Sequence, residues 1–160
     1  MGVVLDSSVL IAAERKRFDL VGFLSAHSND AIFITAITAT ELLHGCERAN
    51  DPAIRERRAR FVEGLFQDYA VLPFTLTEAR THAQLWAELE RKGTPIGERD
   101  LLIAAIAKAH GHTVATVNRD EFARVPGLDL EEVQPFVLKP ASPDRPPQAS
   151  RTGIAFMPAL

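Results

Sequence analysis

Acidic side chains stand beside apolar runs at several points of this sequence. Asp6 directly follows Val3–Leu5, and Asp100 directly precedes Leu101–Ala107. Glu41 is a third candidate, in the threonine-rich segment that follows the next apolar run. Two like charges about 4 Å apart repel by about 4 kcal/mol at an effective dielectric constant of 20. If these carboxylates meet, a hard divalent cation would hold them together, because Mg²⁺ and Mn²⁺ choose oxygen ligands and serve phosphate chemistry.

Local structural roles compete with this interpretation for two of the acids. Asp6 precedes a helix and could cap its first turn. Glu41 follows Thr38 by three residues, which fits a capping box. Asp100 is harder to explain locally, because the helix that it opens is apolar all round and a charge there needs a partner. Arg99 points about 100° away from Asp100 around the helix and is a poor partner for it. A ligand or a distant Arg or Lys must therefore compensate the charge of Asp100.

A fourth polar group follows the apolar run Thr113–Thr116. It contains Asn118, Asp120 and Glu121, and its structural alternative is an asparagine-capped surface turn. Adjacent residues on a helical turn diverge, so only one of the two acids can face a metal. Zinc is disfavoured, because the histidines show no ligand spacing. We therefore expect Mg²⁺, with Mn²⁺ as an alternative.

Short apolar runs alternate with segments of helical spacing along the chain. The strand-like runs are Gly2–Leu5, Ala31–Ile34, Ala70–Leu72, Thr113–Thr116 and Leu128–Val133, of which the first four are expected to be buried strands. The helical segments are Val9–Ala13 with Leu20–Leu24, Thr40–Arg48, Ala53–Gln67, Glu78–Arg91 and Arg99–Ala109. This alternation predicts an α/β fold with a parallel sheet covered by helices on both faces. Ligands of such sheets gather at the carboxyl ends of the strands.

Composition points to one soluble domain. The chain has 160 residues, of which 46% are hydrophobic and 24% are charged, with a net charge of −3 and a single cysteine. Neither a secretory signal nor a membrane-spanning run is present, so we expect a cytoplasmic protein. Proline enrichment after residue 135 predicts a domain over residues 1–138 and a flexible tail over 139–160. Eight of the 18 basic residues lie in Arg15–Arg17 and Arg48–Arg60, either as a patch for a polyanion or as solvated helix faces.

Four blocks, taken together and in this order, resemble the PIN-domain ribonucleases, and more closely the VapC toxins of VapBC toxin–antitoxin pairs. The blocks are Val4–Ser8, Ile37–Gly45, Ile96–Ala105, and Thr116–Phe122 with Val125–Leu128. The invariant acids of the family fall on Asp6, Glu41 and Asp100. Its last block, Thr-x-Asn-x-x-Asp/Glu-Phe, places Asn118 and Glu121, and leaves Asp120 as an extra acid.

The resemblance implies an α/β/α sandwich around a mainly parallel sheet of four to five strands. It also implies an Mg²⁺- or Mn²⁺-dependent endoribonuclease that forms a homodimer and is inhibited by a VapB-type antitoxin. In this scheme Asp6 and Asp100 are the metal ligands. Glu41 ligates the metal through water or takes up the proton, and Glu121 or Asn118 places the attacking water. We expect the antitoxin to cover the apolar segment Phe18–Leu24 and the helix Thr40–Arg48, and to send a basic side chain towards the carboxylates.

Other functions fit less well. A phosphoryl-aspartate enzyme of the haloacid dehalogenase type needs Asp-x-Asp, but Ser8 occupies the second position. A receiver domain needs a lysine late in the sheet, which is missing after Thr116. Glycine-rich phosphate cradles are also lacking. A non-catalytic PIN-like module that acts through a partner protein stays open as the alternative.

Overall fold

The computed structural model describes residues 1–140 of the chain. Its sheet contains four parallel strands in the order β3-β2-β1-β4. The strands are β1 (Gly2–Leu5), β2 (Ala31–Thr35), β3 (Ala70–Leu72) and β4 (Thr113–Ala115). The predicted parallel sheet is confirmed, but Leu128–Val133 forms no fifth strand, because only Leu130 makes a single bridge, to Val114.

The helices follow the strands in the expected alternation. They are α1 (Ser7–Glu14), α2 (Leu20–Ala26), α3 (Ala36–Glu47), α4 (Pro52–Asp68), α5 (Leu76–Lys92), α6 (Glu98–Ala109) and the short α7 (Arg119–Phe122), followed by the 3₁₀ turn η1 (Gln134–Phe136). Local signals set their ends: Asp51 caps α4, and Thr75 with Glu78 forms a capping box at α5. Gly93 closes α5 at φ +66°, a conformation that glycine adopts without strain.

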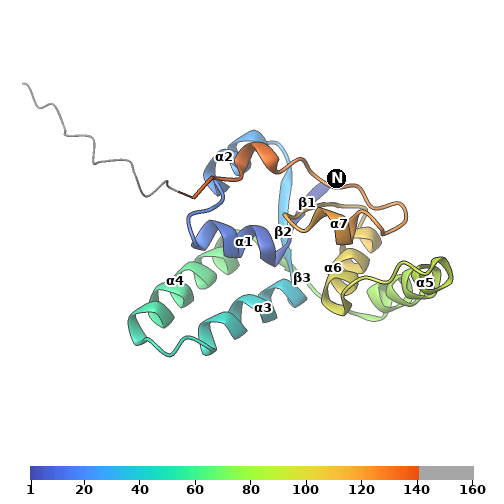
Figure 1. Ribbon diagram of the computed structural model, residues 1–160, viewed down its shortest axis with the longest axis horizontal. Helices are drawn as coiled ribbons and strands as arrows, with labels where there is room; N and C mark the ends of the chain where they lie inside the picture. Colours follow the sequence, from blue (N-terminus) through green and yellow to red (C-terminus); the bar gives the residue numbers. More distant parts are fainter. Residues whose placement is uncertain (141–160) are drawn as a thin grey trace, which may run out of the picture.

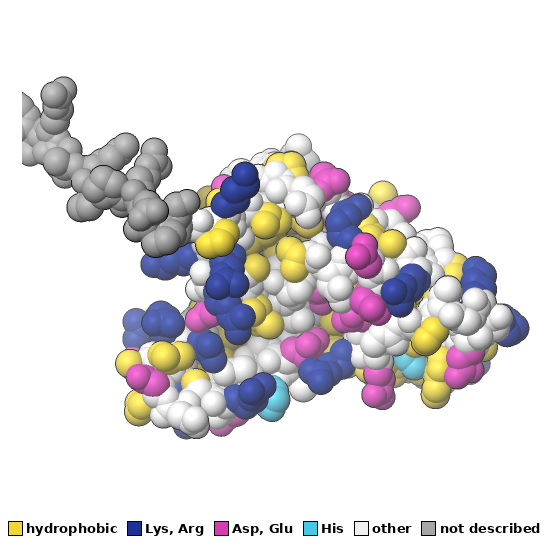
Figure 2. Space-filling view, viewed as in Figure 1, with side chains coloured by type: hydrophobic (Ala, Val, Ile, Leu, Met, Phe, Trp, Pro, Cys, Tyr) yellow, Lys and Arg dark blue, Asp and Glu magenta, His cyan; other side chains and the backbone are white. Residues whose placement is uncertain are grey.

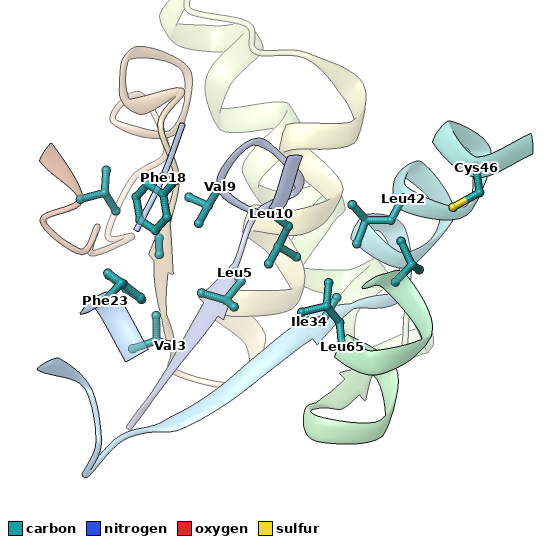
Figure 3. Close-up of a cluster of buried hydrophobic side chains, with 13 residues drawn as sticks. Val3, Leu5, Val9, Leu10, Phe18, Phe23, Ile34, Leu42, Cys46 and Leu65 are labelled. Carbon is teal, nitrogen blue, oxygen red and sulfur yellow. The ribbon is translucent and has the colours of Figure 1, made fainter. Parts of the chain in front are cut away.

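The two faces of the sheet bury two separate apolar clusters. Val3 and Leu5 of β1 point into one cluster with α1, α2 and α4, whereas Val4 points into the other with α5, α6 and α7. Figure 1 accordingly shows α1 and α4 on one side of the sheet and α5 and α6 on the other. Figure 3 shows Val9 and Leu10 of α1 directed into the first cluster beside β1. This three-layer arrangement is the predicted α/β/α sandwich.

Two expectations about exposure are wrong. Phe18 and Phe23 are 3% and 0% exposed and belong to the core, so they provide no apolar surface for an antitoxin. Phe23 packs edge-on against Phe136, with ring centroids 5.4 Å apart, because η1 folds back over α2. Val21 of the same segment is exposed, at 76%. β3 is not a buried strand either: it forms one edge of the sheet, and Val71 is 41% exposed.

The chain returns to its first helices before the predicted domain boundary. The Leu138 amide donates a hydrogen bond to the carbonyl of Arg17 at 2.9 Å, and Val137 pairs with Phe18. Residues 141–160 of the predicted tail lie outside the described residues, so the boundary at 138 stays a prediction. Within residues 1–140, no helix has both the length and the apolar character needed to cross a bilayer.

Candidate active site

Asp6 lies at the carboxyl end of β1, where it is 2% exposed and also caps α1. Its carboxylate accepts hydrogen bonds from Ser8 Oγ at 2.5 Å and from Thr116 Oγ1 at 2.9 Å. Thr116 directly follows β4, which pairs with β1, so the sheet brings together two residues that are 110 positions apart. Asp6 is therefore both a cap and a buried acid with a fixed orientation. The sequence analysis did not identify the contact of Thr116 with Asp6, because only the register of the paired strands creates it.

Glu41 lies in the second turn of α3, a helix that begins at Ala36 with Thr35 as its cap. The capping-box interpretation of Glu41 is therefore wrong, because Thr38 lies inside the helix. Glu41 Oε2 is 3.6 Å from Arg99 Nη1, whereas the buried Oε1 has no hydrogen-bond partner among residues 1–140. Burial, followed by the charge of Asp6, raises the pKa of Glu41 above its ordinary value, and Arg99 partly opposes this rise.

Asp100 lies in the first turn of α6 and is partly buried. Its Oδ2 accepts a hydrogen bond from Asn118 Nδ2 at 3.0 Å. Burial and then the charges of Asp6, Glu41 and Glu121 raise the pKa of Asp100 to about 6. Arg99 pairs with Glu41 rather than with Asp100, as the helix geometry predicted. No ion pair balances Asp100 within the part of the chain that the structure describes.

Glu121 and Asp120, which are neighbours in α7, differ in their contacts. Glu121 Oε2 accepts a hydrogen bond from the Gly97 amide at 3.2 Å, and Oε1 is 3.7 Å from Arg124 Nη1. The charge of Glu121 also contributes to the raised pKa of Asp100. In residues 1–140 Asp120 makes no side-chain hydrogen bond or ion pair. The structure thus brings Asp6, Glu41, Asp100, Asn118 and Glu121 into one region.

The donor set of this region suits a hard divalent cation. It consists of carboxylates, two of which, Glu41 and Asp100, have raised pKa values, and a buried oxygen of Glu41 has no hydrogen-bond partner among residues 1–140. Within residues 1–140, no three His, Cys, Asp or Glu side chains are close enough to form a ready metal cage. Mg²⁺ fits such an open arrangement, because it keeps several water ligands and needs only one or two protein carboxylates.

The predicted basic patch divides into structural and exposed arginines. Arg55 donates to the carbonyl of Ala49 at 3.2 Å, and Arg58 donates to that of Gly45 at 3.1 Å, so both fasten the corner between α3 and α4. Arg57 and Arg60 have side chains that are 67% and 78% exposed. Figure 2 shows Lys and Arg side chains along the side of the molecule that α4 occupies, with acidic side chains nearer the centre.

Residues 3–128 match the model of the PIN domain. The chain belongs to the PIN-domain family. All five predicted site residues lie inside the matched segment. Ribonuclease VapC1 of Rickettsia felis is 35% identical over 130 residues, which cover 81% of this chain and 95% of that protein. The tRNA(fMet)-specific endonuclease VapC of Salmonella typhimurium is 37% identical over 118 residues, covering 74% of this chain and 82% of that protein.

Solved structures give the same assignment. DNA-bound VapBC from Salmonella typhimurium contains a chain that matches with a TM-score of 0.73 and 33% identity, covering 82% of this chain and 97% of that one. VapBC2 from Rickettsia felis, bound to a promoter DNA fragment, matches with a TM-score of 0.72 and 30% identity, covering 82% and 98%. This PIN domain is therefore of the VapC type, and the predicted fold class is confirmed.

Proposed function

We propose that this PIN domain is a divalent-metal-dependent endoribonuclease and the toxin of a type II toxin–antitoxin system. The observation that carries the proposal is the convergence of Asp6, Glu41 and Asp100 at the carboxyl end of the sheet, with the pKa of Asp100 raised to about 6. Such a group of acids costs folding energy unless a cation or a cationic partner compensates it. The names of its VapC relatives, ribonucleases among them, support the same activity.

Asp6 and Asp100 would hold Mg²⁺ or Mn²⁺. When bound there, the ion would polarise a phosphodiester oxygen and lower the pKa of a coordinated water. Asp6 is suited to this task because Ser8 and Thr116 fix its carboxylate. Asn118 orients Asp100 in the same way, through a hydrogen bond of 3.0 Å.

Glu41 would take up the proton of the attacking water. Its raised pKa moves it towards the range in which a carboxylate accepts and releases protons near neutral pH. Glu121 of α7 would help to position that water, because it lies near enough to Asp100 for its charge to raise the pKa of Asp100. No covalent intermediate is required: the single cysteine, Cys46, is buried, and burial raises the pKa of its thiol.

Cleavage of a defined RNA in the presence and absence of metal tests the activity. Two relatives are named tRNA(fMet)-specific endonucleases, so tRNA(fMet) is the first substrate to examine, beside a second tRNA and an unstructured RNA. We expect cleavage with Mg²⁺ or Mn²⁺ and none with EDTA, and loss of cleavage in Asp6→Asn. Equal cleavage with EDTA would refute the metal requirement. Failure to cut any RNA, together with normal partner binding, would favour the non-catalytic alternative.

We also infer that a VapB-type antitoxin binds this chain, since the matching solved structures are VapBC complexes. A cavity of about 80 Å³ between α1, α3 and α4 is lined by both Glu14 and Glu41. Each has a buried Oε1 without a hydrogen-bond partner among residues 1–140, and Arg58 Nε lies 3.6 Å from that of Glu14. Arg57 Nη2 lies 3.8 Å from the same oxygen of Glu14, so the buried oxygen of Glu41 is the one that a basic side chain of the antitoxin would pair with. We further infer a homodimer, which sedimentation of the purified chain tests.

A further inference from the structure

A second hollow lies between α5 and the beginning of α6. Its volume is about 380 Å³, within the range of about 300–1,000 Å³ typical of small-ligand pockets. Leu89 and Leu101 supply apolar walls. The residues that matter for recognition are His82, Trp86, Glu90, Pro95, Ile96 and Glu98. The catalytic roles proposed above use none of them.

Aromatic rings border this hollow. Trp86 is 54% exposed, although Leu85 and Leu89 of the same helix are buried in the core. The Trp86 ring lies 5.9 Å from that of His82, which in turn lies 6.0 Å from that of Phe74. An exposed indole at the rim of a pocket is a stacking surface for a nucleobase, because every base has a flat π-face.

Polar groups in the hollow could recognise the edge of a base. The Nε2 atom of His82 is buried and has no hydrogen-bond partner among residues 1–140. Burial also lowers the pKa of His82, which favours the neutral ring. The carboxylates of Glu90 and Glu98 add acceptors at the rim. Exocyclic amines, which adenine, cytosine and guanine carry and uracil lacks, are the matching donors.

The hollow and the carboxylate site share one wall, the segment from Pro95 to Glu98. The Gly97 amide donates to Glu121 Oε2 at 3.2 Å, and Arg124 Nη1 donates to the Pro95 carbonyl at 3.0 Å. Asp100 follows two residues after Glu98 in α6. Arg124 Nη1 also lies 3.7 Å from Glu121 Oε1, so this side chain joins the shared wall to the carboxylate site. An RNA strand could therefore place its backbone at the carboxylates and one base in the hollow.

We propose that the hollow between α5 and α6 binds one unpaired, amine-bearing base of the RNA substrate, stacked on Trp86. The proposal rests on the proposed nuclease function and adds to it a determinant of base preference. A second copy of the chain fits the hollow less well. A two-fold contact would bring the same surface of two protomers together, and with it the like charges of Glu90 and Glu98.

Fluorescence of the protein itself tests the proposal without any cleavage. Trp86 is the only tryptophan of the chain, so its emission reports directly on this pocket. The full chain is titrated with AMP, UMP and ribose 5-phosphate, and the tryptophan is excited at the red edge of its absorption, where nucleotides do not absorb. We expect saturable quenching by AMP, weaker binding of UMP, and no effect of the base-free ribose 5-phosphate. Equal effects of all three, or none, would overturn the proposal.

Substitutions of Trp86 provide the second arm, measured by calorimetric titration with AMP. Trp86→Ala should weaken binding about 10-fold or more, whereas Trp86→Phe should retain most of it, because a phenyl ring still stacks. Leu76→Ala is the matched control: Leu76 is 68% exposed on the same helix but does not line the pocket, so binding should not change. Unchanged binding in Trp86→Ala would refute the stacking role.

Sedimentation and RNA cleavage separate the remaining outcomes. If Trp86→Ala dissociates an oligomer and leaves AMP binding unchanged, the hollow is an interface between copies and the proposal fails. If AMP binds at Trp86 but the protein cuts no RNA, the base pocket stands and the nuclease function fails. If RNA is cut normally and AMP does not quench Trp86, the nuclease function stands and the base pocket fails.

Discussion

Replacing Asp100 by asparagine should stabilise the metal-free protein and abolish its cleavage of RNA. The pKa of Asp100 rises from its ordinary 3.8 to about 6, first because of burial and then because of the charges of Asp6, Glu41 and Glu121. Asparagine removes one of the repelling charges. Its side-chain oxygen can still accept the hydrogen bond from Asn118, which lies 3.0 Å away in the wild-type protein.

The size of the effect follows from this raised pKa. A shift of about two units corresponds to about 3 kcal/mol between the two protonation states. Asp100 is only partly buried, so water screens the repulsion, and we expect a gain of about 1–2 kcal/mol in the free energy of unfolding. The folded state binds this proton more tightly than the unfolded state does. The loss of stability caused by the ionised Asp100 is therefore fully present above pH 6 and disappears as the pH falls towards 4.

Urea denaturation in EDTA at pH 7.5 and pH 4 measures the difference. Asp100→Asn should unfold at higher urea concentration than the wild type at pH 7.5 and at nearly the same concentration at pH 4. Glu98→Gln is the matched control, because Glu98 shares the first turn of α6 but is exposed. It should lose up to about 1 kcal/mol of favourable interaction with the helix dipole. Added Mg²⁺ should stabilise the wild type more than Asp100→Asn.

Two results would refute this reasoning. A destabilised Asp100→Asn protein at pH 7.5 would mean that the acids do not repel one another in the folded state. A gain that is equal at both pH values would mean that the effect does not come from ionisation of Asp100. In the cleavage assay, wild-type activity of Asp100→Asn would remove Asp100 from the metal site.

Three further predictions concern the surroundings of the site. Glu121→Gln should reduce kcat/KM for RNA far more than Asp120→Asn, because the charge of Glu121 raises the pKa of Asp100 and its carboxylate accepts a hydrogen bond from the Gly97 amide; the reverse order would assign the role to Asp120. Thr116→Val keeps the side-chain shape but removes a donor to the buried carboxylate of Asp6, so urea unfolding should show a loss of about 1–3 kcal/mol, with reduced activity; an unchanged midpoint would contradict it. Inhibition by a co-expressed VapB-type antitoxin should weaken as Mg²⁺ rises; inhibition that is insensitive to Mg²⁺ would argue against a basic side chain of the antitoxin at the buried oxygen of Glu41.

The sequence by itself determined most of the secondary-structure elements and the acidic residues of the candidate site. The bounds of β1 and β3 agree with the runs Gly2–Leu5 and Ala70–Leu72, because short apolar and β-branched runs between polar segments are a local signal. The parallel sheet followed from the alternation of strands and helices. The resemblance to VapC toxins placed Asp6, Glu41 and Asp100, and the structure brings these three side chains into one region.

Only the tertiary structure decided what surrounds those acids and which apolar residues are exposed. Contacts such as Thr116 with Asp6 depend on the pairing of β1 with β4, which no local pattern encodes. The capping-box interpretation of Glu41 was wrong because α3 begins one turn earlier than Thr40, the expected start. Phe18 looked like a surface residue, because a short apolar segment does not reveal that η1 folds back to cover it. Side-chain periodicity is local, whereas burial and the pKa of a carboxylate depend on every element that packs around it.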